Sequence, residues 1–423
     1  MNIAGDFKKK STINSVYTNM FIFLAGKMVS LFGSRIMNFA IGLYVLRVTG
    51  SGISFALTMI ISTVPAILIS PFVGVLADRL NRKMVVVLAD ALCGLFLIIA
   101  YLIALKTGLT LSLVFITVFF LSILNTFFNI TMEASIPNIV DERRLTKINS
   151  YNSSITSLAA IVGPALGGFV YGFVPIDMFL LLAGICFIIS ATTETFINFN
   201  FNDIPVVEKS KGKVLYEIIS AARYVRTKQV IFTIFMFAVF INFVFSAYTV
   251  SLPHIVNVQL GLSPEQYGLI QSSFAIGSLI FSLIYSIMPD KKSKYRYLIS
   301  ALMIVSILMM ITGIPTLTLF NSVSQTNLLL YYFMLINFSI GGALMFVNLP
   351  CFILIQRKTS DEYRGRVYGL LDTMSLSFQP LGMILGGLFT DYISSFLLVL
   401  ICGILFLVTS LILTKVKGLK EAI

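Results

Sequence analysis

The chain has 423 residues, of which 57% are hydrophobic and only 11% are charged. A soluble globular protein carries roughly 25% charged residues, so this chain has too little polar surface to cover a water-exposed body. The four cysteines lie far apart in apolar runs and His254 is the single histidine, which predicts neither a disulfide framework nor a metal site.

Apolar stretches long enough to cross a membrane follow one another along the chain. Residues 1–17 are polar and no cleavage-like site follows them, so we expect the first apolar run to stay as a membrane helix. Twelve spanning helices can be drawn, over residues 19–46, 52–76, 84–105, 111–136, 150–173, 176–199, 229–257, 264–288, 297–319, 327–355, 367–390 and 394–415.

Lysines and arginines gather in the two tails, in every second loop and in the middle segment. The exceptions are Lys27, Arg35, Arg47 and Lys106. Positive charge of this kind marks the cytoplasmic side, so both termini are predicted to be cytoplasmic. The net charge of +12 then reflects contact with membrane lipid, and nucleic acid is not expected as a partner.

The longest polar stretch divides the chain into two halves. Residues 214–228 look helical, with Leu215, Ile218 and Ile219 on one face, which is typical of an interfacial helix. We therefore predict a six-helix bundle over 1–199, a cytoplasmic linker with an interfacial helix over 200–228, and a second six-helix bundle over 229–423.

Two short patterns recur in the second half at nearly the same offset, which favours an internal duplication. Asp78, Arg79 and Arg82 align with Asp290, Lys291 and Lys294. Further along, Glu142, Lys147, Gly163, Gly167 and Gly168 align with Asp361, Arg366, Gly382, Gly386 and Gly387.

The first pattern resembles the loop signature G-x-x-x-D-R-x-x-R-K of the major facilitator superfamily. It consists of Gly74, Asp78, Arg79, Arg82 and Lys83. In that family the aspartate faces the positive end of helix 11, here at Gly365 and Arg366, and latches the two halves on the cytoplasmic side. The alternative is an ordinary cytoplasmic loop whose positive charges only determine the orientation of the protein in the membrane.

The second pattern resembles the G-P-x-x-G-G antiporter signature, in Gly163, Pro164, Gly167 and Gly168. The glycines give a smooth face for close helix contact, and the proline bends the helix. An ordinary packing seam of small residues is the alternative.

Three further segments, over residues 48–52, 145–151 and 362–369, resemble macrolide-efflux-type drug exporters, and the likeness covers nearly the whole chain. This resemblance implies proton-coupled export. The chain departs from many such antiporters because no arginine lies near Leu121 in the fourth helix, which puts the usual proton relay of that helix in doubt.

Ionisable residues inside membrane helices are costly and indicate function. The candidates for proton transfer or ion pairing are Arg35, Asp90, Glu133 and Asp372. In one interpretation these residues and Glu194 form ion pairs that stabilise a closed cytoplasmic gate. Asp90 would then pair with Arg35, and Glu133 with Arg79 or Arg82. The other has Asp90 or Glu133 take a proton in one state and an arginine in the other.

The family resemblance implies a central cavity lined by helices 1, 4, 7 and 10. Few polar groups in an apolar lining suit bulky amphiphiles. The candidate lining residues are Asn38, Asn125, Asn129, Asn242, Asn337 and Gln379, with Tyr44, Tyr248, Gln271 and Asn348 nearby.

We therefore expect an all-α polytopic protein with twelve transmembrane helices in two pseudo-symmetric six-helix bundles. It would be a monomeric secondary transporter in the bacterial cell membrane that exports small amphiphilic molecules by alternating access. The resemblance implies proton antiport with no cofactor. An exporter or flippase of one endogenous compound, such as a siderophore or a lysolipid, is the alternative. An enzyme is disfavoured because no nucleotide-binding loop or catalytic triad is visible.

Overall fold

A computed structural model describes residues 3–199, 201, 214–288, 294–317 and 326–416, which form helices and no strands. The first six helices are α1 (Ile3–Thr49), α2 (Gly52–Arg79), α3 (Arg82–Thr107), α4 (Leu111–Ile139), α5 (Glu142–Phe173) and α6 (Ile176–Glu194). Those that follow are α7 (Val214–Thr227), α8 (Gln229–Pro253), the π-helix η1 (His254–Gln259), α9 (Pro264–Ile287), α10 (Lys294–Thr312), the 3-10 helix η2 (Ile314–Thr316), α11 (Thr326–Lys358), α12 (Asp361–Ser377), α13 (Gln379–Tyr392) and α14 (Ser395–Thr414).

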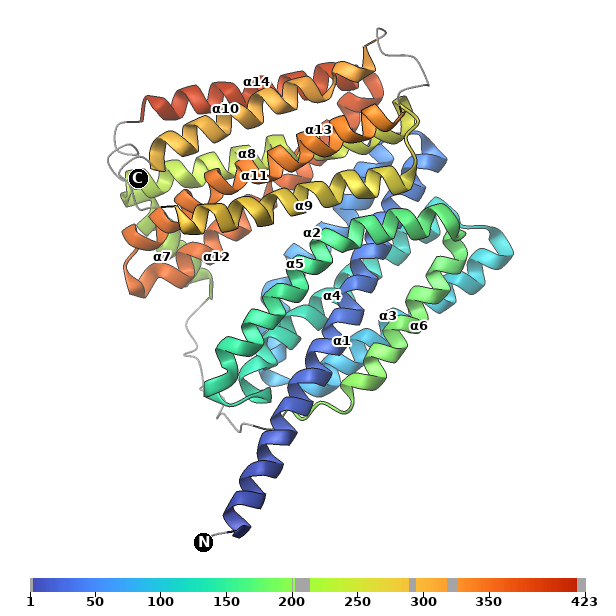
Figure 1. Ribbon diagram of the computed structural model, residues 1–423, viewed down its shortest axis with the longest axis vertical. Coiled ribbons are helices and arrows are strands. Elements are labelled where there is room, and N and C mark those ends of the chain that lie inside the picture. The colour runs from blue at the N-terminus through green and yellow to red at the C-terminus, as the bar shows by residue number, and fades with distance from the viewer. Residues whose placement is uncertain (1–2, 200, 202–213, 289–293, 318–325, 417–423) are drawn as a thin grey trace. The chain divides into compact units, whose positions relative to one another are not determined.

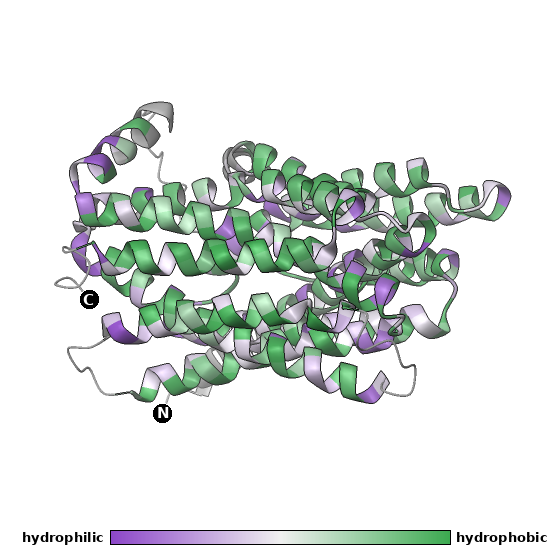
Figure 2. Cartoon of the chain, turned by 90° about the horizontal axis from the view of Figure 1, so that it is seen from above, coloured by the Kyte–Doolittle hydropathy of each residue, from purple (hydrophilic) through white to green (hydrophobic). Residues whose placement is uncertain are grey.

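Within these residues, eleven helical stretches are long and apolar enough to cross a membrane. Hydrophobic residues run along most of their length (Figure 2). The predicted helix over 367–390 differs, because it is divided at Phe378 into α12 and α13. Pro380 is the physical reason: its ring crowds the carbonyl group four residues earlier and it offers no amide hydrogen to that carbonyl.

The chain forms two compact units. The first contains Met1–Ile41 and Ile61–Val207, and the second contains Gly42–Ile60 and Glu208–Ile423. The end of α1 and the start of α2 therefore pack in the second unit, whereas the predicted N-terminal bundle includes them.

In the first unit, α3 packs against α4 and α6 (Figure 1). The crossing of α3 and α6 is close because glycines meet there: a Cβ atom on Gly94 would lie 2.7 Å from the Gly184 carbonyl oxygen. In the second unit, α9 packs against α11, α10 against α14, and α13 against α8. Glycines again allow the approach, with Gly277 facing the Phe338 carbonyl and Gly403 facing that of Ser306.

The two units use their repeated glycines in the same way. On α5, Gly163 faces Arg35 of α1, and on α13 Gly382 faces Phe243 of α8. One turn later, Gly167 faces Phe39 and Gly386 faces Ala247. Arg35 and Phe243 are as far apart in sequence as Phe39 and Ala247, so the equivalent contacts agree with a duplicated six-helix unit.

The turn between α1 and α2 has a defined structure. Gly50 has a φ of 62°, which favours glycine and allows the chain to reverse sharply. The carboxylate of Asp391, at the end of α13, then accepts hydrogen bonds from the Ser51 hydroxyl (2.6 Å) and from the backbone N–H groups of Gly52 (2.5 Å) and Ile53 (3.2 Å). A negative charge at the start of α2 is favourable, because the helix dipole is positive there.

Candidate functional site

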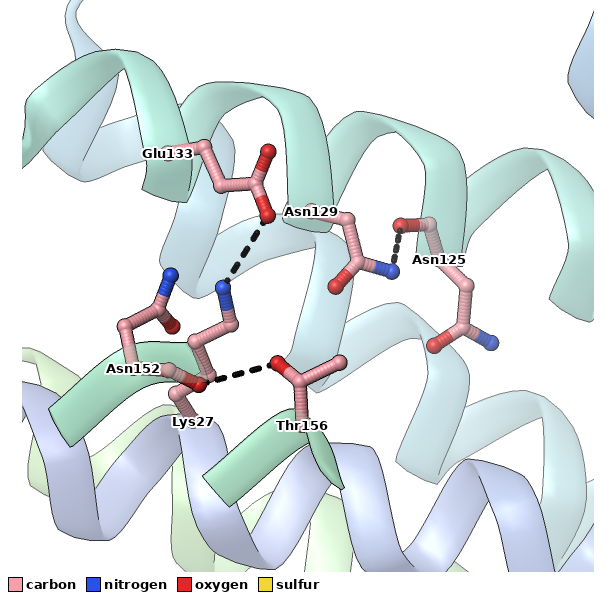
Figure 3. A network of polar contacts seen from close by, with 6 residues as sticks. All are labelled: Lys27, Asn125, Asn129, Glu133, Asn152 and Thr156. Atoms are coloured by element: carbon pink, nitrogen blue, oxygen red, sulfur yellow. Dashed lines mark hydrogen bonds and ion pairs between the residues drawn. The ribbon is translucent and has the colours of Figure 1, made fainter. Parts of the chain in front are cut away.

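Polar side chains of the first unit gather where α1, α4 and α5 face one another. Figure 3 shows Lys27 of α1, Asn125, Asn129 and Glu133 of α4, and Asn152 and Thr156 of α5. The three α4 residues are spaced four apart, so they lie on one stripe of the helix. We call these six residues the polar face.

An ion pair forms the centre of the polar face. The ammonium group of Lys27 lies 3.3 Å from Oε1 of Glu133. The Lys27 side chain is only 2% exposed, whereas that of Glu133 is 63% exposed. A buried ammonium group is costly without a partner, so Glu133 offsets the charge of Lys27 while one side of the carboxylate stays accessible.

The predicted partners of Glu133 are therefore corrected. Arg82 donates to the Ala134 carbonyl (2.8 Å) and to Oδ1 of Asn138 (2.5 Å), which holds the start of α3 against the end of α4. The side chain of Arg79 lies outside the described residues. The sequence did not indicate Lys27 as the partner because it does not determine how α1, α3 and α4 are rotated about their axes.

Hydrogen bonds hold the asparagines of α4 in place. Ser34 donates to Oδ1 of Asn125 (2.7 Å), and the Asn125 amide donates to the Leu121 carbonyl (2.9 Å). The Asn129 amide donates in turn to the Asn125 carbonyl (2.8 Å). Asn129 thus lies one turn of α4 from Glu133 and Asn125 lies two turns from it, while Asn38 is exposed on α1. The cavity lining stays a prediction.

Two acidic residues are fully buried where α1, α3 and α6 meet. Asp90 and Glu194 are both 0% exposed. Ser30 of α1 donates to Oδ1 of Asp90 (3.0 Å), and Ser190 donates to Oε1 of Glu194 and to the Gly26 carbonyl (3.0 Å each). We call Asp90 and Glu194 the buried carboxyl pair.

The predicted pairing of Asp90 with Arg35 is wrong. Arg35 is exposed, and its Cβ lies against Gly163 of α5. The reason is helical geometry, because five residues separate Arg35 from Ser30 and turn it about 140° away from Asp90. The Asp372 side chain lies outside the described residues.

The second unit has polar groups of its own. Gln379 donates to Oδ1 of Asn242 (3.1 Å), and Ser246 donates to the Gln379 carbonyl (2.9 Å). Asn337 is only 2% exposed and donates to the Phe333 carbonyl of its own helix (3.0 Å), so in this structure it does not line an open cavity. Tyr248 is also buried.

The two sequence signatures are described only in part. In the loop signature, the side chains of Asp78 and Arg79 lie outside the described residues. The surroundings of Gly365, the predicted partner in the gate, are not described either, so the gate stays a prediction. Lys83 is half-buried, and Arg366 is exposed over the Tyr363 ring. In the α5 signature, Gly163, Gly167 and Gly168 are buried, and Pro164 lies inside the helix.

A long series of apolar helices with an internal repeat, and a polar face held between them, defines a multi-pass membrane transporter and not an enzyme. The family model of the Major Facilitator Superfamily matches residues 23–377 and, in a second match, residues 243–421. The chain belongs to this superfamily. The second match covers the second half alone, in agreement with the duplication.

Comparison with individual proteins gives distant relatives over nearly the full length. The chain is 23% identical to macrolide efflux protein A of Streptococcus pyogenes, over 94% of this chain and 95% of that protein. It is 22% identical to the staphyloferrin A transporter of Staphylococcus aureus, over 87% and 89% of the two chains. The crystal structure of the nucleoside transporter NupG has the same fold, with a TM-score of 0.66 and 16% identity over 94% and 98% of the chains.

Proposed function

We propose that this protein exports small amphiphilic molecules across the bacterial cell membrane in exchange for protons. The observation that carries the proposal is the polar face, where the buried Lys27 is paired with the accessible Glu133 inside apolar membrane helices. Charged side chains inside the membrane are costly. Apolar residues at these positions would give a bundle that is at least as stable, so the charges indicate a functional role.

The polar face has the composition expected of a site for amphiphiles. A few fixed polar groups orient a ligand, and the apolar surface around them binds its bulk. A substrate with a cationic group can replace Lys27 beside the Glu133 carboxylate. The likeness to macrolide efflux protein A, at 23% identity, supports export as the direction of transport.

The rest of the proposed transport system follows the family. The two halves, 1–199 and 229–423, would alternate access to the site, with the loop signature closing it on the cytoplasmic side. The proton gradient supplies the energy, and no cofactor takes part. We propose a monomer with both termini in the cytoplasm, membrane lipid as its surroundings and no nucleic-acid partner.

A second candidate is the export of one endogenous compound, such as a siderophore or a lysolipid. Its support is the likeness to the staphyloferrin A transporter, at 22% identity. The two candidates differ in the range of substrates. Transport of several unrelated amphiphiles favours the first candidate, whereas accumulation of one metabolite in a deletion strain favours the second.

The test is uptake into proteoliposomes with an imposed pH gradient. We expect wild-type protein to accumulate several amphiphiles while the gradient lasts, and Glu133→Gln to lose this accumulation. Glu265→Gln, an acid in the first turn of α9, is the matched control and should behave as wild type. Uptake that is indifferent to the gradient, or that is unchanged in Glu133→Gln, would contradict the proposal.

A further inference from the structure

The buried carboxyl pair lies in one of the most tightly packed parts of the first unit. Asp90 is one turn before Gly94, where α3 and α6 make their closest approach. Gly26 of α1 closes the cluster from the other side, since a Cβ atom there would lie 3.2 Å from the Glu194 side chain. In this structure neither carboxyl group is exposed to solvent, since both residues are 0% exposed.

The hydrogen bonds of the pair are incomplete. Each carboxyl group has one oxygen that accepts from a serine, Ser30 for Asp90 and Ser190 for Glu194. The other oxygens, Oδ2 of Asp90 and Oε2 of Glu194, are buried without a hydrogen-bond donor. Both carboxyl groups lie against the same turn of α1, Asp90 at Ser30 and Glu194 at Gly26, so they are close neighbours. A buried polar atom without a partner requires an explanation.

The surroundings supply no positive charge. In the part of the chain that the structure describes, no lysine or arginine forms an ion pair with Asp90 or Glu194. The groups that face the pair are the Gly26 carbonyl and the Ser30 hydroxyl from α1, the Cys93 thiol from α3, and the Ser190 hydroxyl from α6. All of these are neutral.

Two adjacent carboxylates without a cation repel each other, and each is deprived of water. One proton reduces both problems. The carboxyl group that carries it donates its O–H hydrogen to the other carboxylate, so a single negative charge remains and both remaining oxygens gain a hydrogen-bond partner. A hydrated metal ion is far larger than a proton and does not suit a site closed by three packed helices.

We propose that Asp90 and Glu194 together form a proton-binding site, which provides the coupling proton of the transporter. The coupling role rests on the function proposed above, whereas proton binding does not. No bond other than O–H forms or breaks: the proton moves from water to a carboxylate oxygen and back.

One turn of α1 links this site to the polar face. Within residues 26–30, the Gly26 carbonyl accepts from Ser190, Lys27 pairs with Glu133, and Ser30 donates to Asp90. When the proton leaves, the two carboxylates need water or a cation, and this turn of α1 must move to provide either. Such a movement also changes the Lys27–Glu133 pair, where substrate would bind.

The direct test is infrared spectroscopy of the reconstituted full chain. We expect a C=O stretching band of a buried carboxylic acid that is lost in Asp90→Asn and in Glu194→Gln. Asp177→Asn, in the first turn of α6, is the matched control and should keep the band. A wild-type spectrum without the band at any pH where the protein stays folded would overturn the proposal, and loss of the band on adding sodium would show a metal-ion site instead.

Transport measurements distinguish this proposal from the proposed function. We expect Asp90→Asn and Glu194→Gln to lose uphill accumulation but to keep downhill exchange. If wild-type protein shows the band but no gradient-driven transport, the proton site stands and the proposed function fails. If Asp90→Asn accumulates substrate as wild type does, the coupling role fails alone. Ser30→Ala, which keeps both acids, replaces Asp90→Asn if that variant does not fold, and should shift the band.

Discussion

The ammonium group of Lys27 lies in a membrane helix, and a single carboxylate, that of Glu133, offsets its charge. Its side chain is among the largest that are fully buried, so its methylene groups pack against neighbouring helices while the ammonium group reaches Glu133. The exposure of the two partners is very different, and the consequence of removing one depends on which charge is left. Loss of Glu133 leaves a charge in the interior, whereas loss of Lys27 leaves one that water can still reach.

The first prediction concerns this asymmetry. Glu133→Gln should lower the free energy of unfolding by about 1–3 kcal/mol, since a buried charged donor loses its partner. Lys27→Met should cost less, because the Glu133 carboxylate is largely exposed. The double variant Lys27→Met/Glu133→Gln should recover much of the stability but not the transport. Thermal unfolding in detergent measures this, and equal losses in the two single variants would contradict it.

The second prediction concerns Tyr224 of α7, which lies outside the membrane-spanning segments. The Ser360 backbone N–H donates to its hydroxyl oxygen (3.2 Å), and this hydrogen bond, with help from the Lys228 charge, lowers the pKa of Tyr224. A pKa that is lower in the folded state stabilises the folded state above the unfolded pKa of about 10. That contribution is lost as the pH falls through the folded pKa, so it is absent at neutral pH.

Carbon NMR of the labelled tyrosine rings measures this titration. Tyr224→Phe assigns the signal, which should titrate below the ordinary tyrosine value of about 10. A Tyr224 signal that titrates at the ordinary tyrosine value would show that the hydrogen bond from Ser360 does not persist in solution.

At the scale of elements, the crossing of α3 and α6 depends on two glycines. In Gly94→Ala the new methyl group would lie 2.7 Å from the Gly184 carbonyl oxygen, so the helices must separate. We expect a loss of about 1–3 kcal/mol from overpacking, despite the better helix propensity of alanine. Gly33→Ala is the matched control, because its nearest neighbour is the Phe187 ring at 3.8 Å. Comparable melting temperatures for the two variants would refute the role of the crossing.

The start of α2 provides the next prediction. Asp391→Ala removes the acceptor of three hydrogen bonds from Ser51, Gly52 and Ile53. Backbone hydrogen exchange at residues 52–53 should rise about fivefold to tenfold, since losing a capping acceptor costs ~1 kcal/mol. Mass spectrometry of the peptide around this turn measures the change, and a distant peptide from α14 serves as the internal reference. Unchanged exchange would show that Asp391 does not hold the start of the helix.

The elements could be predicted from the sequence far better than their contacts. Long apolar runs require helices in a membrane, and glycine spacing marks close crossings, so α5 and its repeat in α13 were predictable. The partner of Glu133 was not, because the choice between Lys27 and Arg82 depends on how three helices rotate about their axes. The break before Pro380 was also missed, because Pro164 occupies a comparable place in α5 without dividing that helix.

At the scale of the whole molecule, composition and charge distribution determined most of what could be predicted. The duplication is visible in both the glycines and the two matches to the family. The packing of residues 42–60 in the second unit was not predictable. The hydrophobic pattern of a helix shows which residues are buried, but it does not show which bundle buries them. Asp391 is an example, since its binding to the start of α2 joins segments more than 300 residues apart.

Orientation in the membrane follows from the same charge distribution and has a direct test. Arg226, at the end of α7, should be cytoplasmic because basic residues cluster around it, and Thr110, between α3 and α4, should lie outside. In a variant without the native cysteines, an impermeant thiol reagent applied to intact cells should label Thr110→Cys and leave Arg226→Cys unlabelled. Permeabilised cells control for reactivity. Labelling of Arg226→Cys in intact cells would place the lysines and arginines outside, against the field and lipid charge that hold them in the cytoplasm.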